Sequence, residues 1–128
     1  MMDFSLPPNP NVFFHQVWQV ARQVPHGRVA TYGQIARLVP MPGGIEPDDY
    51  RAYGSRWVGK ALAACPADVP WQRVINAQGK ISKRPGADKQ RQLLEQEGVS
   101  FINDKIDLKE YQWRDPSQPD VPRQSRLF

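Results

Sequence analysis

Proline and glycine divide this chain into short segments, and their positions limit the fold to short helices joined by loops. Apolar residues recur at helical spacing over 13–24, and Pro25-His26-Gly27 ends that pattern. A second helix, predicted over 32–39, stops before Pro40. With 40% hydrophobic residues in 128, the chain can build one core. We therefore expect a single domain of short elements.

The predicted second helix has a well-marked start. Thr31-Tyr32-Gly33-Gln34 matches a capping box, in which the threonine hydroxyl and the glutamine side chain each bond the other residue's backbone amide. The stretch 41–54 contains several prolines and glycines, so it is predicted to be a long loop. Ser55 is then a suitable N-cap for a third helix over 56–64.

The second half of the chain carries a small β element. Two short apolar segments, 71–75 and 80–81, flank the turn residues 76–79, which predicts a small hairpin or winged turn. Further along, the pattern predicts a helix over 88–97 and an extended strand over 106–113 that covers the core. The fold class is therefore expected to be mainly α with a small β element, similar to a winged helix-turn-helix.

The two ends of the chain are predicted to lie outside this domain. Residues 1–10 and 116–128 are rich in proline and polar residues and have little to bury, so both are expected to be flexible tails. The domain is accordingly placed at 11–115.

Charge and cysteine content limit the class of function. Lys and Arg total 17 against 13 Asp and Glu, and the resulting charge of +4 suits a polyanionic partner. Cys65 is the only cysteine, so neither an internal disulfide nor a cysteine-built zinc site can form. No apolar run is long enough for a membrane helix, and the first residues lack the basic and then apolar pattern expected of a secretion signal. We expect a cytoplasmic, nucleoid-associated monomer without cofactor or metal.

Five sequence motifs of this chain, taken in chain order, resemble those of the C-terminal, DNA-binding domain of O6-alkylguanine-DNA alkyltransferases. They span most of the chain, from about residue 13 to residue 113, and their order is specific. The motifs are Val24-Pro25-His26-Gly27-Arg28-Val29-Ala30-Thr31-Tyr32-Gly33-Gln34-Ile35-Ala36, Arg56-Trp57-Val58-Gly59-Lys60-Ala61-Leu62, Pro70-Trp71-Gln72-Arg73-Val74-Ile75-Asn76, Gly79-Lys80-Ile81-Ser82 and Leu93-Leu94-Glu95-Gln96-Glu97-Gly98.

The motif that defines the repair enzymes of that family is changed at two adjacent positions. The family has Pro-Cys-His-Arg-Val, whereas this chain has Pro70-Trp71-Gln72-Arg73-Val74. An indole cannot replace a thiolate as the alkyl acceptor, and an amide cannot act as a base near neutral pH. Tryptophan at this position is similar to the alkyltransferase-like proteins, which bind alkylated guanine without repairing it. Those proteins usually keep a histidine where Gln72 stands.

The resemblance implies roles for several residues. Tyr32 matches the tyrosine that helps to rotate the nucleotide out of the duplex, and Arg56 matches the arginine finger that takes its place in the stack. Trp71 would form a wall of the pocket, and Arg84 would lie over the alkylguanine ring. Further contacts to DNA or the lesion are expected from Ser55, Lys60, Ile81, Ser82 and Lys83.

Each of these residues also has a purely structural alternative. Tyr32 could pack on the first helix, Trp71 could be a core residue, and Arg56 and Arg84 could be solvated. Arg73 is expected to brace the hairpin through backbone carbonyls. The acidic insertion between residues 39 and 55 is expected to point away from the phosphates or to contact a protein.

Three functions remain open on the sequence. The first is non-enzymatic recognition of O6-alkylguanine in duplex DNA by minor-groove binding and base flipping, which marks the lesion for nucleotide excision repair proteins. The second is alkyl transfer to Cys65, although a thiolate is disfavoured at the C-terminal end of a helix. The third is a sequence-reading helix-turn-helix regulator, which the basic third helix suggests.

Overall fold

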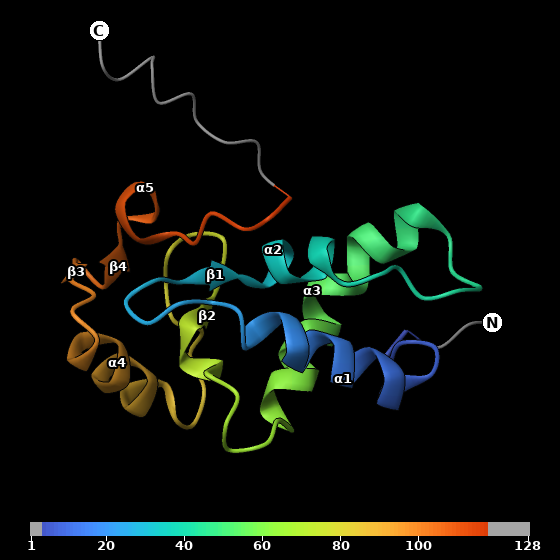
Figure 1. Ribbon diagram of the computed structural model, residues 1–128, viewed down its shortest axis with the longest axis horizontal. Coiled ribbons are helices and arrows are strands. Elements are labelled where there is room, and N and C mark those ends of the chain that lie inside the picture. The colour runs from blue at the N-terminus through green and yellow to red at the C-terminus, as the bar shows by residue number, and fades with distance from the viewer. Residues whose placement is uncertain (1–3, 118–128) are drawn as a thin grey trace, which may run out of the picture.

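Short helices dominate the fold. The computed structural model describes residues 4–117. The elements in chain order are α1 (Pro10–Ala21), β1 (Ala30–Thr31), α2 (Tyr32–Leu38), α3 (Pro47–Ala63), the 3-10 helix η1 (Trp71–Arg73), β2 (Val74–Ile75), α4 (Ala87–Gln96), β3 (Phe101–Ile102), β4 (Lys105–Ile106) and α5 (Leu108–Tyr111) (Figure 1). The prediction of a mainly α domain with a small β element is confirmed.

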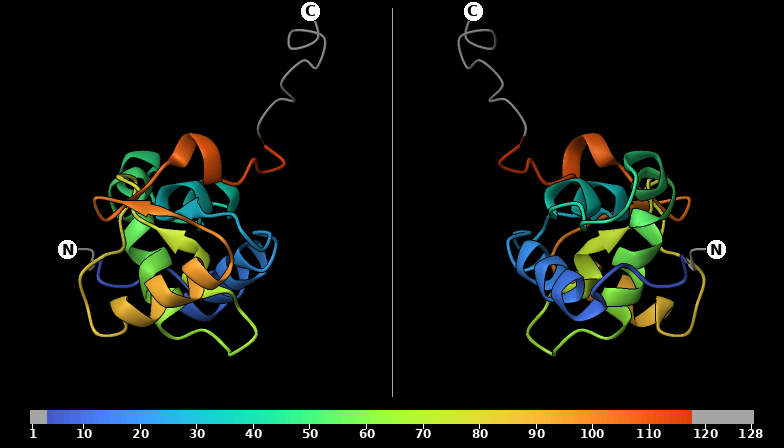
Figure 2. Two further views of the ribbon diagram at one scale, coloured as in Figure 1. Left: turned by 90° about the vertical axis from the view of Figure 1, so that its left-hand side faces the viewer. Right: turned by 90° about the vertical axis from the view of Figure 1, so that its right-hand side faces the viewer.

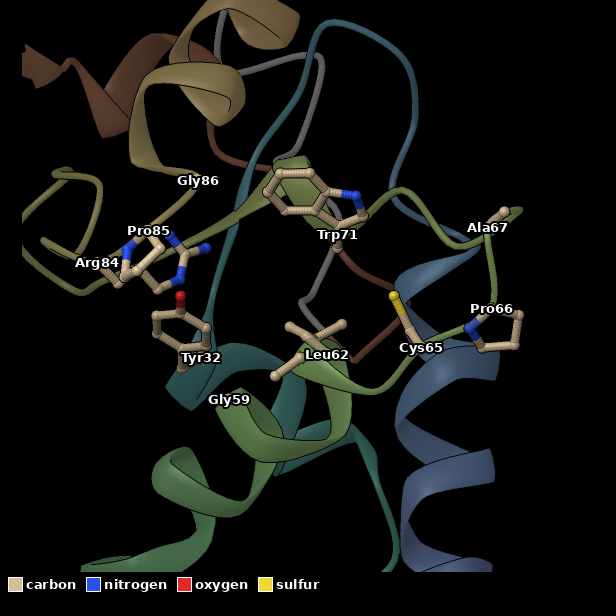
Figure 3. A pocket seen from close by; sticks show the side chains of 11 residues that line it. Tyr32, Gly59, Leu62, Cys65, Pro66, Ala67, Trp71, Arg84, Pro85 and Gly86 are labelled. Atoms are coloured by element: carbon tan, nitrogen blue, oxygen red, sulfur yellow. The ribbon is translucent and has the colours of Figure 1, made fainter.

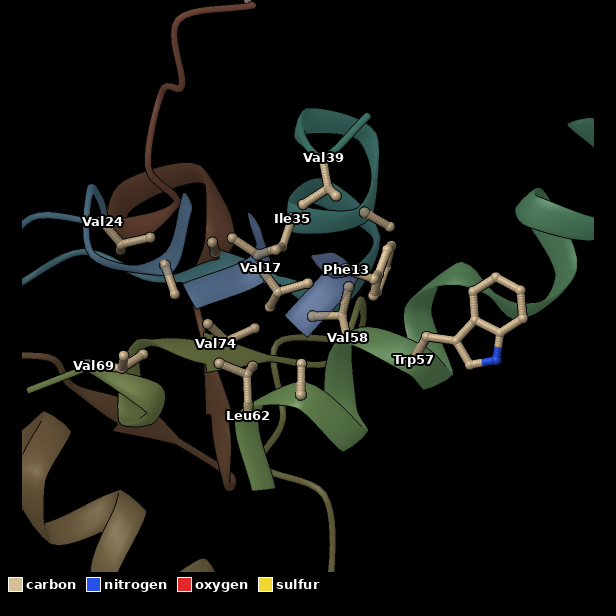
Figure 4. Close-up of a cluster of buried hydrophobic side chains, with 14 of the residues drawn as sticks. Phe13, Val17, Val24, Ile35, Val39, Trp57, Val58, Leu62, Val69 and Val74 are labelled. Carbon is tan, nitrogen blue, oxygen red and sulfur yellow. The ribbon is translucent and has the colours of Figure 1, made fainter. Parts of the chain in front are cut away.

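The main core lies where α1, α2 and α3 pack on one another. Its side chains include Phe13 and Val17 of α1, Ile35 of α2 and Val58 of α3 (Figure 4). A second, smaller cluster forms around Leu94, where α4 meets the β3–β4 hairpin and β2. Views from the two ends show α4 and the hairpin at one end of the molecule and the N-terminal turns of α1 and α3 at the other (Figure 2).

Helix α2 begins as predicted. The Thr31 hydroxyl accepts a hydrogen bond from the Gln34 backbone amide at 3.1 Å, and the Gln34 side chain accepts one from the Thr31 amide at 3.3 Å. Gln34 is fully buried, and its amide nitrogen also donates to the Trp113 carbonyl oxygen and the Asp115 carboxylate. The capping box therefore also ties α2 to the C-terminal segment of the domain.

Helix α3 is much longer than predicted. The predicted loop over 41–54 is wrong in its second half, because α3 starts at Pro47, and Ser55 lies inside the helix rather than at its N-cap. Proline is well placed in the first turn, where its missing amide has no helical partner, and acidic residues there favour the helix dipole. Gly54 does not break the helix, since it allows the Tyr50 ring and Ala36 of α2 to pack closely.

The N-terminal segment is packed against the domain. Pro10, inside the predicted tail, is the first residue of α1, and the helix ends at Ala21 rather than at residue 24. The ring of Phe4 stacks on the ring of Tyr53 with 4.5 Å between the ring centroids. The backbone carbonyl oxygen of Phe4 accepts a 2.8 Å hydrogen bond from Trp57 Nε1. Residues 1–3, and 118–128 of the predicted C-terminal tail, lie outside the described residues.

The β elements differ from the predicted hairpin. β2 pairs in parallel with β1, with Ala30 opposite Val74 and Thr31 opposite Ile75, and residues 80–81 form no strand. The turn itself exists, since the Asn76 amide donates to the Lys80 carbonyl oxygen at 3.1 Å. The pairing was not predicted because the two strands lie far apart in the sequence, where local patterns carry no information.

The strand predicted over 106–113 is also wrong. β3 and β4 form an antiparallel hairpin, and α5 follows with Asp107 at its N-cap, where the carboxylate accepts from the Lys109 amide at 3.0 Å. An aspartate at this position favours a helix start over a strand. Trp113 nevertheless covers the core, as expected, and is 8% exposed. No helix within 4–117 has the length and apolar character needed to cross a membrane.

Candidate functional site

A cavity of about 370 Å³ lies between α3, η1 and the loop that leads into α4. Its lining includes Tyr32, Gly59, Cys65, Trp71 and Arg84, which come from four separate segments of the chain (Figure 3). The structure thus brings together three of the four principal residues predicted from the sequence. Its volume falls in the range of about 300–1,000 Å³ that small-ligand sites occupy.

Tyr32 is placed by the start of α2. It is the first residue after the Thr31 N-cap, and its half-buried ring lies on the cavity wall. In Figure 3 its hydroxyl points toward the loop that carries Arg84. The pairing of β1 with β2 holds this helix start beside the segment that follows Trp71. The ring therefore stands at the cavity with its polar end free to meet a ligand.

Trp71 begins η1 and has both of the roles that the sequence left open. It is half-buried and packs against the main core, and the same ring forms part of the cavity wall. The guanidinium carbon of Arg84 lies 6.0 Å from the Trp71 ring centroid, at the limit of a cation–π contact. An aromatic face and a cation thus face one space, an arrangement that suits a flat aromatic guest.

Arg84 is exposed but anchored. Its Nη2 donates a 2.8 Å hydrogen bond to Oε1 of Gln90 in α4. The loop turns into the helix at Gly86, whose φ of 93° lies in the left-handed region where glycine has no steric penalty. Sequence reasoning missed Gln90, because a glutamine within a helix is ordinarily a solvated residue.

One face of α3 continues the cavity lining toward the N-terminus of that helix. Arg56 precedes the lining residue Gly59 by three positions, so both lie on the same side of α3. Arg56 is exposed, with its guanidinium 6.0 Å from the Tyr53 ring centroid, and does not line the cavity. The position of Ser55 beside Gly33 places it next to the start of α2.

The other residues predicted to contact DNA or the lesion differ in how exposed they are. Lys60 is exposed on α3, and Lys83 is exposed on the loop beside Arg84, so both can reach a phosphate backbone. Ser82 is half-buried in the same loop. Ile81 packs against the second hydrophobic cluster, which makes it a support for the loop.

Behind Trp71, the side chain of Glu97 joins three segments, and sequence reasoning missed this network. Its carboxylate accepts hydrogen bonds from Gly27 N at 2.8 Å, Gln72 Nε2 at 2.9 Å and Arg73 Nε at 3.0 Å. Burial opposes the charge of Glu97, but these hydrogen bonds outweigh it and hold its pKa below the ordinary value. Arg73 also donates to the carbonyl oxygen of Val24, in the turn after α1, so it bonds a backbone carbonyl as predicted but does not brace the predicted hairpin.

Cys65 lies just beyond the end of α3, on the cavity wall. Its sulfur points toward Trp71 in Figure 3. Burial raises the pKa of this thiol above its ordinary value of 9.0, so it is protonated near neutral pH. Because the thiolate is the nucleophilic form, the site favours an unreactive thiol.

Within residues 4–117, no three His, Cys, Asp or Glu side chains come together to hold a metal ion. The cavity lining presents an aromatic wall at Trp71, a cation at Arg84, the ring of Tyr32 and the thiol of Cys65.

The chain matches a family model described as the DNA binding domain of 6-O-methylguanine DNA methyltransferase, over residues 12–99. The DNA base-flipping protein of Vibrio parahaemolyticus is 42% identical over 106 residues, which cover 80% of this chain and 96% of that protein. Alkyltransferase-like protein 1 of Schizosaccharomyces pombe is 38% identical over 112 residues, covering 80% and 94%.

A solved structure extends this likeness to the fold. S. pombe Atl1, in complex with damaged DNA containing O6-carboxymethylguanine, matches with a TM-score of 0.68 at 36% identity. The match covers 82% of this chain and 97% of that chain.

Proposed function

Because this chain belongs to the family of the 6-O-methylguanine DNA methyltransferase DNA-binding domain and resembles its alkyltransferase-like members, we propose that it binds O6-alkylguanine in duplex DNA without removing the alkyl group. The observation that carries the proposal is the cavity in which Tyr32, Trp71 and Arg84 meet. A base turned out of the duplex would enter this space and stack on the indole.

Recognition begins with the exposed residues around the cavity. Lys60 and Lys83 meet phosphates, and this contact positions the protein without reading the sequence. Tyr32 presses on the backbone at the cavity mouth, and Arg56, on the same face of α3, fills the gap that the flipped nucleotide leaves. An inserted side chain of this kind offsets part of the unstacking free energy.

The absence of alkyl transfer follows from the groups around Trp71. Its neutral indole cannot accept an alkyl group as a thiolate does, and the neighbouring Gln72 amide is bonded to Glu97 and does not titrate. Cys65 is held as a protonated thiol by burial. The lesion therefore stays chemically intact in the complex.

An intact lesion must be removed by another activity. We therefore extend the proposal to a marking role, in which the bound protein directs nucleotide excision repair to the site. The acidic first turn of α3 lies at the opposite end of the helix from the cavity, with Asp48 exposed and paired with Arg51 and Asp49 half-buried, and it is the surface that we propose for a protein partner.

The decisive experiment combines binding with product analysis. Fluorescence anisotropy should show much tighter binding to a duplex with O6-methylguanine than to the same duplex with guanine. Mass spectrometry after incubation should find the methyl group on the DNA and none on the protein. Equal affinity for the two duplexes would refute lesion recognition, and a methyl adduct on Cys65 would instead establish transfer.

A further inference from the structure

Gln90 is a fully buried polar side chain on α4, next to the cavity but not part of its lining. We propose that Gln90 is a positioning residue that holds Arg84 over the cavity before DNA binds. This inference rests on the proposed function, because it concerns the residue that would cover the flipped base. It adds a role that the sequence motifs do not contain.

The hydrogen bonds of Gln90 fix the direction of its amide. Its Nε2 donates to the Gln72 carbonyl oxygen at 3.1 Å and to the Val74 carbonyl oxygen at 2.9 Å. Carbonyl oxygens can only accept, so the NH₂ group must face them. The amide oxygen is consequently turned away from β2 and toward the loop, where it accepts from Arg84 Nη2 at 2.8 Å.

This geometry links the two walls of the cavity. Gln72 belongs to η1 with Trp71, and Arg84 belongs to the facing loop. One buried side chain bonds both segments, so Gln90 connects the Arg84 guanidinium to the backbone next to Trp71, whose ring centroid lies 6.0 Å from that guanidinium. Gln90 is itself held by two backbone acceptors and packed in the interior, so it is a rigid reference point.

The energetic benefit comes from order that exists before binding. A long arginine side chain on an exposed loop loses rotamer freedom when it settles on a ligand. If Gln90 has already restricted Arg84, less of this entropy is lost in forming the complex. We therefore expect Gln90 to contribute to affinity for the lesion without touching the DNA.

A double-mutant cycle tests this role. Gln90→Met keeps the length of the side chain but removes the acceptor for Arg84. We expect it to weaken binding to an O6-methylguanine duplex by roughly three- to tenfold in the native background. In an Arg84→Ala background the same change should have a clearly smaller effect, limited to what the lost bonds to the Gln72 and Val74 carbonyl oxygens contribute. Gln92→Met, an exposed position on the same helix, should leave binding unchanged. An equal loss in both backgrounds would overturn the proposal.

A second measurement remains informative if Gln90→Met fails to fold. Nitrogen-15 relaxation of arginine Nε groups in the unaltered free protein should show restricted motion for Arg84, compared with the exposed Arg56 on α3. Equal mobility of the two would also overturn the positioning role. Because this measurement uses no DNA, it separates failure of the positioning role from failure of lesion recognition.

Discussion

The side-chain amide of Gln72 donates a 2.9 Å hydrogen bond to Oε2 of Glu97. Glu97 also binds Arg73 and the Gly27 amide, so one carboxylate connects η1, the turn after α1 and the end of α4. With its side chain 7% exposed, this carboxylate is the most buried member of an ion pair among the described residues. Its contacts favour the charged form, so it stabilises the segment that carries Trp71 most when it is ionised.

Replacement of this carboxylate should destabilise the fold. Glu97→Gln keeps the shape but removes the charge that pairs with Arg73, and we expect a loss of about 2–3 kcal/mol in the free energy of unfolding. Urea denaturation at neutral pH measures this loss. The exposed Glu95→Gln is the matched control and should change stability by less than about 0.5 kcal/mol. A similar effect for both would contradict a special role for Glu97.

The same network predicts a pH dependence. The pKa of Glu97 is below its ordinary value of 4.5 in the folded protein, so the unfolded chain binds the proton more readily. The stabilisation is therefore fully present above about pH 5 and is lost as the pH falls through the folded-state pKa. Denaturation midpoints between pH 6 and about pH 3 should fall more steeply for the native chain than for Glu97→Gln. If the midpoints of the two proteins fall in parallel with pH, the pH dependence does not come from Glu97.

Lesion binding should depend on Tyr32 and Arg56. We expect Tyr32→Ala and Arg56→Ala each to weaken binding to an O6-methylguanine duplex by roughly tenfold or more, because they act on the flipped nucleotide. Circular dichroism should show an unchanged fold. Arg51→Ala removes the same charge from an exposed position in the first part of α3, outside the cavity lining, and serves as the control. Unchanged affinity in both test variants would exclude base flipping by these residues.

Salt dependence should distinguish phosphate contacts from lesion contacts. Lys83→Ala should reduce the slope of log affinity against log salt by about 1 and weaken binding to modified and unmodified duplexes alike. Trp71→Phe should mainly change the preference for the lesion and leave the slope in place, because an aromatic wall does not displace counterions. Titrations at several salt concentrations measure both quantities. A changed salt slope for Trp71→Phe would contradict the assignment of Trp71 to lesion contacts and Lys83 to phosphate contacts.

Two glycines of α3 should respond in opposite ways to alanine. A methyl group at Gly54 would lie 3.2 Å from Cε1 of Tyr50, and the Tyr50 hydroxyl donates to the Ala36 carbonyl oxygen, so the ring cannot move aside. Gly54→Ala should therefore lower stability by about 1–2 kcal/mol. Gly59→Ala meets nothing within 4 Å and should gain up to about 1 kcal/mol of helix propensity. Thermal melts of the two variants make the comparison.

The sequence predicted those parts of the molecule that depend on local patterns. The capping box at Thr31 needs only four consecutive residues, and it was found correctly. The start of α3 was missed because Gly54 reads locally as a helix breaker, whereas its contact with Ala36 in another helix makes glycine suitable. The pairing of Ala30 with Val74 has no local signature at all.

In the candidate site, too, residues in sequence motifs were found and residues that depend on distant contacts were missed. The resemblance to a family identified Tyr32, Trp71 and Arg84, and the structure places all three on one cavity. Gln90 and Glu97, which hold the cavity walls, lie on α4 or at its end and were not found from the sequence. Helical patterns report which side chains are apolar, but they do not report which buried polar side chains meet a distant partner.

The short parallel pairing of β1 with β2 has a consequence for how the protein is made. It joins Ala30 to Val74, so during synthesis the first three helices can leave the ribosome while one wall of the cavity is still inside it. Contacts between distant residues form late because the intervening chain must first close into a loop. A nascent chain should thus acquire a helical core before it has any affinity for damaged DNA, and only the finished domain can compete for a lesion.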